Sequence, residues 1–169
     1  PQGLTGTTTQ VVTVAVGSGV GNVTVSGRVT YERVPFSSTI SSGLNYANTS
    51  AQPAREIVVE LLTPAQAVLA TGSTDSNGSY AFTAPANTNV FVRAKAQSLR
   101  SSSPTRDIRV LNNTSGNALY VLDGAAFNTG TTSQTRNLLA ASGWGGSSYT
   151  GTRAAAPFSA APRSAPTGL

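Results

Sequence analysis

The segment Asn22–Arg33 alternates apolar and polar residues, and this period of two constrains the fold more than any other feature of the sequence. Successive side chains of a β-strand point to opposite faces of its sheet. One predicted face carries Val23, Val25, Val29 and Tyr31, and the other carries Thr24, Ser26, Arg28 and Thr30. Such a strand packs one face on a core and turns the other toward water, as is typical of antiparallel sheets. No stretch of the chain shows a sustained helical period.

Further short segments with β-branched or aromatic residues follow this strand, each bounded by turn residues. They are Arg55–Leu62, Gln66–Thr71, a strand with Tyr80 and Phe82 on one face, Val90–Ala96, Asp107–Leu111 and Ala118–Leu122. A turn signature, Asp75, Asn77 and Gly78, separates two of them. This succession of short strands predicts an all-β fold, an antiparallel β-sandwich of immunoglobulin-like or transthyretin-like type.

The chain divides by composition into three predicted parts. Residues 1–21 form an N-terminal arm with an extra strand at Thr9–Val16, and residues 22–123 form the sandwich. Residues 124–169 are predicted to be an irregular Gly/Ala/Pro-rich C-terminal extension, with one helical turn at Asn137–Ala141. The arm and the extension lie outside a minimal sandwich, and they therefore need a separate explanation.

The middle of the chain, roughly residues 25–96, resembles the carboxypeptidase-regulatory-like, or transthyretin-like, sandwich domains of secreted bacterial proteins. The resemblance is carried by Val25–Val29, Pro53–Arg55, Val68–Ala70, Thr74–Tyr80 and Val90–Ala94. It implies an accessory sandwich without catalysis of its own, of the kind that is appended to secreted enzymes, adhesins and surface proteins.

The composition argues against an enzyme. The chain has no Cys and no Met, and without His it lacks the commonest general base and the commonest transition-metal ligand. Ser and Thr are abundant, but a nucleophilic hydroxyl needs a base beside it. We therefore predict no catalytic residue, no cofactor and no bound metal. Only 10% of residues are charged, and this neutral, hydroxyl-rich composition predicts an extracellular or cell-surface location.

The acidic residues have simple interpretations. Glu56 and Glu60 fall on one predicted strand, where four residues span about 13 Å, so a solvated face explains them better than a catalytic carboxylate pair. Asp75 and Asn77 offer oxygens to Ca²⁺, but a turn-forming role is favoured. Lys95 is the sole lysine. A covalent Lys–Asn bond is the chemical alternative for it, and a solvent-facing position on its strand is favoured.

The net charge of +5 raises nucleic acid as a partner. However, the arginines are scattered, and the densest group is Arg93, Lys95, Arg100, Arg106 and Arg109, with few aromatic residues between them. We predict no nucleic-acid partner. No apolar run approaches the roughly 20 residues of a membrane span, so no span is predicted either.

Two functions remain. The first is an exported structural subunit that self-associates, and an extracellular filament is one form that the assembly can take. Each copy would donate a strand to the sheet edge of its neighbour, and that strand contains Thr9, Val11, Val12, Val14 and Val16. The second is a carbohydrate- or surface-binding accessory domain that uses Trp144, Tyr149 and Tyr46. For Trp144, within Gly-Trp-Gly-Gly, a plug over an open end of the sandwich is the favoured alternative to ligand stacking.

Overall fold

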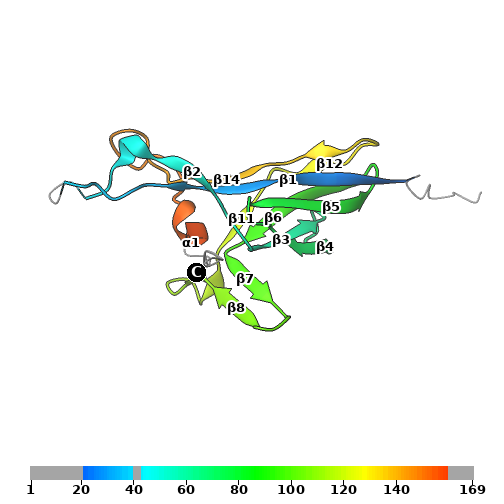
Figure 1. Ribbon diagram of the computed structural model, residues 1–169. Coiled ribbons are helices and arrows are strands. Elements are labelled where there is room, and N and C mark those ends of the chain that lie inside the picture. Colours follow the sequence, from blue (N-terminus) through cyan, green and yellow to red (C-terminus); the bar gives the residue numbers. More distant parts are fainter. Residues whose placement is uncertain (1–20, 40–42, 160–169) are drawn as a thin grey trace, which may run out of the picture.

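The computed structural model describes residues 21–39 and 43–159, and these form two five-stranded sheets and two two-stranded hairpins. The two larger sheets pack on each other around one apolar core (Figure 1). This arrangement confirms the predicted all-β, sandwich-like fold. The predicted strand Thr9–Val16 lies outside the described residues.

The first sheet is organised around β1 (Asn22–Arg33), the strand with the alternating pattern. Along one side, β1 pairs antiparallel first with β5 (Ser79–Pro85) and then with β2 (Ser50–Pro53). Along its other side it pairs in parallel with β13 (Gln134–Thr135) and β14 (Leu138–Ala140). One long strand thus pairs with segments from the middle and from the C-terminal part of the described chain.

The second sheet has the strand order β11-β6-β3-β4, with β12 also paired to β6. Its members are β3 (Val58–Leu62), β4 (Val68–Ser73), β6 (Asn89–Lys95), β11 (Val121–Asp123) and β12 (Phe127–Asn128). All pairings in this sheet are antiparallel. In the described residues β4 pairs only with β3, so β4 is an edge of the sheet.

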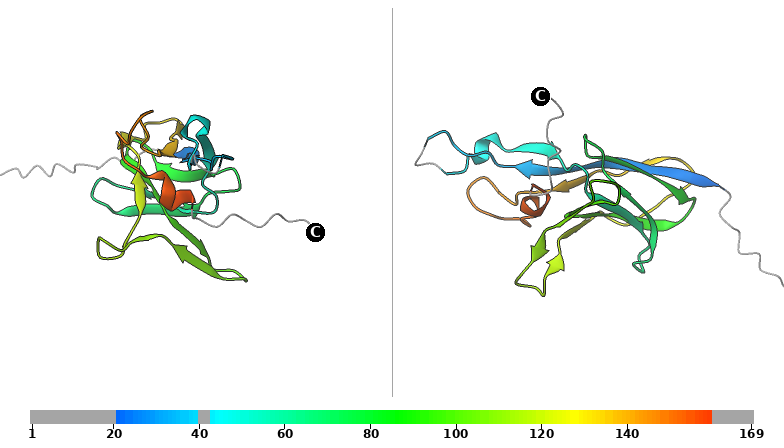
Figure 2. Two further views of the ribbon diagram at one scale, coloured as in Figure 1. Left: turned by 90° about the vertical axis from the view of Figure 1, so that its left-hand side faces the viewer. Right: turned by 60° about the horizontal axis from the view of Figure 1, so that its bottom comes forward.

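Smaller elements lie around the sandwich. The hairpin of β7 (Gln97–Arg100) and β8 (Arg106–Arg109) projects away from the two sheets (Figure 2), and β9 (Leu111–Asn112) pairs with β10 (Ala118–Leu119). A 3₁₀ turn, η1 (Tyr46–Asn48), lies in the loop between β1 and β2. The helix α1 (Ala155–Ser159) packs against β1, with Phe158 buried.

The core is built from the inward faces of both sheets. Its fully or nearly fully buried members include Val25, Val29, Val59, Leu61, Val90, Val92 and Ala94. The face of β1 predicted to be apolar is the buried one, because Val23, Val25, Val29 and Tyr31 are each at most 6% exposed. Burial of this apolar surface is the main favourable contribution to folding.

Residues 124–140 depart from the predicted irregular extension. β13 and β14 complete the first sheet, and Leu138 and Ala140 are buried in the core. Asn137–Ala141 therefore contains a strand and not a helical turn, since pairing with β1 satisfies its backbone groups. The short helix forms later, at α1. Two- and three-residue strands leave no measurable alternation in a sequence.

The close approach of β1 and β13 depends on Gly27. A Cβ atom built on Gly27 would lie 1.9 Å from the carbonyl oxygen of Arg136. That carbonyl also accepts a hydrogen bond from the hydroxyl of Tyr80, and burial raises the pKa of Tyr80 well above its usual range. Tyr80, named in the family resemblance, therefore stays neutral and ties β5 to the segment before β14.

The positions of Glu56 and Glu60 differ from the sequence prediction. Glu56 does not share a strand with Glu60: it precedes β3 at a φ of +53°, and its carboxylate lies 2.8 Å from Arg106. Glu60 is on β3 but only 8% exposed, because Lys95 of the neighbouring strand β6 pairs with it. The solvated face predicted for Glu60 is therefore wrong.

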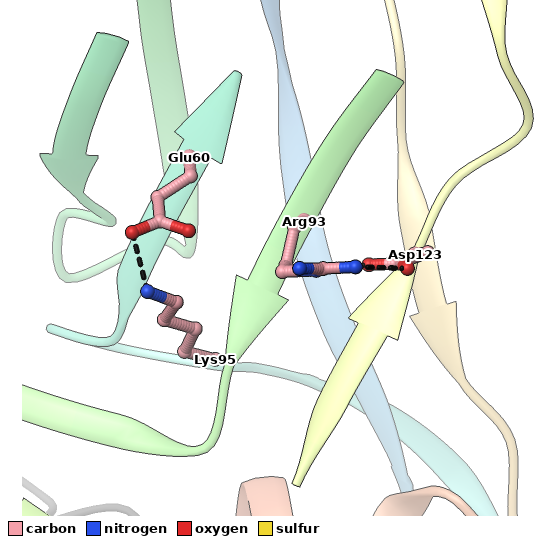
Figure 3. A network of polar contacts seen from close by, with 4 residues as sticks. All are labelled: Glu60, Arg93, Lys95 and Asp123. Carbon is pink, nitrogen blue, oxygen red and sulfur yellow. Dashed lines mark hydrogen bonds and ion pairs between the residues drawn. The ribbon is translucent and has the colours of Figure 1, made fainter. Parts of the chain in front are cut away.

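Lys95 lies on the outer face of the second sheet and forms an ion pair with Glu60 (Figure 3). In the next row, Arg93 of β6 makes a two-bond contact with Asp123 of β11, at 2.6 and 2.7 Å. The amine of Lys95 thus faces a carboxylate rather than solvent alone. Such charge-assisted contacts between adjacent strands help to fix their register.

Candidate functional site

Two loops lie together at one end of the molecule, beyond the end of β1 that pairs with β2 and β14 (Figure 1, cyan and orange). The first loop joins β1 to β2 and contains Tyr46. The second follows β14 and contains Trp144 and Tyr149. The three aromatic residues that the sequence analysis named as ligand candidates are therefore brought together from distant parts of the chain.

The aromatic cluster Tyr46–Trp144–Tyr149 is closely packed. The rings of Tyr46 and Trp144 stack with their centroids 4.0 Å apart and their planes inclined by 21°. Tyr149 meets both rings edge-on, and its hydroxyl oxygen lies 2.5 Å from that of Tyr46. This hydrogen bond raises the pKa of Tyr46 above its ordinary value, so the Tyr46 hydroxyl is neutral at physiological pH. Stacked and edge-on pairs of this kind stabilise the junction of the two loops.

The glycines around Trp144 form a tight hairpin. The residues Trp144 and Tyr149 face each other in an antiparallel bridge, and Thr150 donates its backbone N–H to Gly143 at 3.0 Å. Gly143 has a φ of +75°, a left-handed conformation that favours glycine. The Gly-Trp-Gly-Gly motif thus aims both aromatic rings toward Tyr46.

Trp144 does not plug an end of the sandwich. Its ring packs on Tyr46, and the apolar core includes β14 and α1 on either side of it in sequence but not Trp144 itself. The physical reason is that the hairpin turns Trp144 toward the other loop rather than toward the sheets. The exposed member of the cluster is Tyr149, with 44% of its surface accessible.

A cleft of about 350 Å³ lies beside Tyr149. Its polar lining comes from Glu32, Arg33, Ser142, Arg153 and Ser159, and its apolar lining includes Ala155 and Ala156 of α1. This volume is within the lower part of the range of small-molecule sites, which combine apolar walls with a few convergent polar groups. The cleft therefore has the volume and the mixed lining of a small-molecule site.

Glu32 is fixed at the wall of the cleft. Its Oε2 accepts hydrogen bonds from the backbone N–H of Ser142 at 2.7 Å and from the Ser142 hydroxyl at 2.6 Å. These two bonds lower the pKa of Glu32 below its usual value, so the carboxylate is ionised at neutral pH. The contact also joins the end of β1 to the residue that begins the aromatic hairpin.

Arg153 covers one face of Tyr149, with its guanidinium carbon 4.6 Å from the ring centroid. Stacking on an aromatic face leaves the in-plane N–H donors of a guanidinium available to other groups. Arg33 lines the same cleft from β1. The arrangement offers hydrogen-bond donors, a carboxylate acceptor and an aromatic ring within one concave surface.

The sequence analysis did not single out Glu32, Ser142 or Arg153. One signal was available for Glu32, since the alternation of β1 places it on the solvent side at the strand's end. No pattern in the sequence links Ser142 or Arg153 to β1, because more than a hundred residues separate Ser142 from Glu32.

The turn signature forms a compact turn of its own, away from the cleft. The Oδ1 of Asp75 accepts the backbone N–H groups of Asn77 and Ser79, both at 2.8 Å, and Gly78 has a φ of +75°. Asp75 therefore uses this oxygen within the turn. Among residues 21–39 and 43–159, no group of three or more acidic or other metal-ligating side chains gathers in one place. Over the same ranges no helix has the length and apolar character of a membrane span.

No protein-family model matches the chain, and no curated protein matches it. Among solved structures, a candidate carbohydrate-binding protein from Pseudomonas aeruginosa aligns with 74% of this chain and 92% of its own, at 14% identity and a TM-score of 0.41. A 9R-lipoxygenase from Cyanothece aligns with 79% of this chain and 18% of its own, at 16% identity and a TM-score of 0.36. Both scores lie below 0.5, so neither likeness carries information on function.

Proposed function

We propose that this chain is a non-catalytic, extracellular β-sandwich module that binds carbohydrate in the cleft beside Tyr149. The observation that carries the proposal is the cleft itself, where an exposed aromatic ring stands next to a fixed carboxylate and two guanidinium groups. The proposal includes that the chain is related to transthyretin-like accessory domains, as residues 25–96 predict.

The chemistry of the cleft suits a sugar. A pyranose ring presents C–H groups on its faces and hydroxyls around its rim, so it needs an aromatic surface and in-plane polar partners at once. Tyr149 supplies the ring, Glu32 has its Oε1 available as an acceptor, and Arg33 and Arg153 supply donors. Tyr46 and Trp144 hold Tyr149 in place and are positioning residues in this proposal.

Replacing Tyr149 by alanine is expected to weaken binding of a carbohydrate ligand by about tenfold or more, because the aromatic wall of the cleft is lost. Replacing Trp144 by alanine is expected to weaken it less, since the ring it supports remains. A glycan array identifies a ligand for the unmodified chain, and titration calorimetry with that ligand measures the change.

Tyr120→Ala is the matched control for this experiment. Tyr120 is also a partly exposed tyrosine, with 37% of its surface accessible, and it does not line the cleft. The Tyr120→Ala variant should leave the affinity for the carbohydrate ligand unchanged. Equal losses in Tyr120→Ala and Tyr149→Ala, or an array without any bound glycan, would count against the proposal.

Self-association by strand addition is a second candidate, favoured by the edge strand β4. In the described residues β4 has one partner, and its Val68 and Leu69 are 51% and 41% exposed. An edge with free backbone groups and exposed apolar side chains is a template for another strand. The predicted donor is Thr9–Val16 of a neighbouring copy, a β-branched segment without charge.

Deleting residues 1–16 is expected to convert any polymer into monomers, because the donor strand is removed. Light scattering after size-exclusion chromatography measures the particle mass, and electron microscopy shows whether filaments form. Leu69→Lys tests the acceptor side, since a lysine on an edge strand opposes strand addition. A full-length chain that is monomeric at high concentration, or a polymer that survives both changes, would exclude this mode of assembly.

A further inference from the structure

The acidic residues of the chain show how the charges of the cleft are partnered. The sequence has six Asp and Glu residues, and all of them lie within the described part of the chain. Four form ion pairs away from the cleft: Glu56 with Arg106, Glu60 with Lys95, Asp107 with Arg109, and Asp123 with Arg93. Asp75 caps its turn.

Glu32 is the sixth, and it directs its Oε2 to Ser142 rather than to a cation. Across residues 21–39 and 43–159, neither Arg33 nor Arg153 has a carboxylate within ion-pair distance, although Glu32 lines the same cleft. Two cations with one anion give the cleft a net positive charge. Among the described residues outside the cleft, four cations have a carboxylate partner, namely Arg93, Lys95, Arg106 and Arg109.

The two arginines also bring two sets of N–H donors to one cleft. Arg153 lies over the ring of Tyr149, with its guanidinium carbon 4.6 Å from the ring centroid. A guanidinium edge binds carboxylate or sulfate oxygens through paired hydrogen bonds. Arg33 extends from the end of β1, a strand anchored on both sides, so the second donor group starts from a rigid element.

We propose that the ligand of this cleft is an acidic saccharide, whose carboxylate or sulfate group binds Arg33 and Arg153 while a sugar ring lies on Tyr149. This inference rests on the proposed carbohydrate function and specifies its substrate class. Glu32 accepts a sugar hydroxyl through its Oε1 and excludes an anionic group from its own side of the cleft. The anion is thereby oriented toward the arginines.

The test compares ligands that differ only in charge. Tetragalacturonate and its methyl ester share the same rings, but the ester has no carboxylate. A sulfated galactan tetrasaccharide and its desulfated form provide the same comparison for sulfate. In titrations of the full chain at low salt, we expect at least one charged ligand to bind about tenfold more tightly than its neutral counterpart, and the preferred pair distinguishes carboxylate from sulfate as the anion.

Arg33→Gln and Arg153→Gln are each expected to remove most of this preference, because they weaken binding of the charged ligand much more than binding of the neutral one. Arg153→Lys separates stacking from charge, because lysine keeps the charge but loses the planar edge. Arg100→Gln is the control, since Arg100 lies on the β7–β8 hairpin and does not line the cleft. Thermal unfolding verifies that each variant remains folded.

The outcomes separate the two proposals. If charged and neutral ligands bind equally, or if the arginine variants keep the preference, the acidic-saccharide inference is overturned and carbohydrate binding stands. If neither the charged nor the neutral ligands bind and a glycan array is empty, the proposed function itself fails. A charge preference that is lost in Arg33→Gln and Arg153→Gln but kept in Arg100→Gln supports both.

Discussion

The Gly27→Ala variant is expected to lose about 3 kcal/mol or more of its free energy of unfolding, because the added methyl group meets backbone atoms. The new Cβ would lie 1.9 Å from the carbonyl oxygen and 2.6 Å from the carbonyl carbon of Arg136. Both atoms belong to the backbone, so relief requires moving the segment between β13 and β14 away from β1. That movement would also disturb the Tyr80 hydrogen bond.

Gly72→Ala is the matched control. Gly72 is also a strand glycine, but its added Cβ would meet only the ring of Phe82, at 3.3 Å. A ring can shift by a few tenths of an ångström, and alanine reduces the entropy of the unfolded chain. We expect a change below about 1 kcal/mol for this variant. Urea unfolding measures the change in the free energy of unfolding for both variants, provided that the m-value stays constant. Equal stability losses in the two variants would contradict the role assigned to Gly27.

The Thr74→Val variant is expected to lose about 3 kcal/mol of stability, because one hydroxyl satisfies two buried backbone groups. Thr74 is 3% exposed; its Oγ1 donates to the carbonyl of Ala54 at 2.7 Å and accepts the N–H of Ile57 at 3.1 Å. Valine has nearly the same shape, so the loss reports hydrogen bonding rather than a cavity. Each unsatisfied buried group costs about 1–3 kcal/mol.

Thr74→Ser separates the hydroxyl from the methyl group. Serine keeps both hydrogen bonds and loses only one buried methyl, a change of about 1 kcal/mol. The measurement is again the urea midpoint of each variant. If serine proves as destabilising as valine, packing and not the hydroxyl holds the segment from Ala54 to Ile57, and the assignment is wrong.

The strands that a sequence can predict here are those with sustained alternation. Asn22–Arg33 was identified with the bounds that the structure gives it, because ten or more alternating residues leave little ambiguity. β13 and β14 were not identified, since two or three residues cannot establish a period. Their strand conformation is imposed by β1, a long-range partner that local propensity does not report.

The candidate site shows the same division. Tyr46, Trp144 and Tyr149 were recognised individually because large aromatic residues are rare in this chain. Their mutual contacts depend on how two loops about a hundred residues apart meet in space. The cleft beside them depends further on Glu32 and on α1, whose positions follow from the parallel pairing of β14 with β1. Geometry of this kind is a property of the assembled fold.

The parallel pairing of β1 with β14 also has a consequence for how the protein is made. Val29 pairs with Leu138, which lies 109 positions later in the sequence (138 − 29), so this part of β1 acquires its partner on one side only after β14 has been synthesised. Pairings of such long sequence separation slow folding, typically to the millisecond-to-second range. During translation, one side of β1 therefore stays unpaired until β13 and β14 have left the ribosome. A chain truncated before residue 134 would lack both β13 and β14, and this side of β1 would remain an unpaired, aggregation-prone edge.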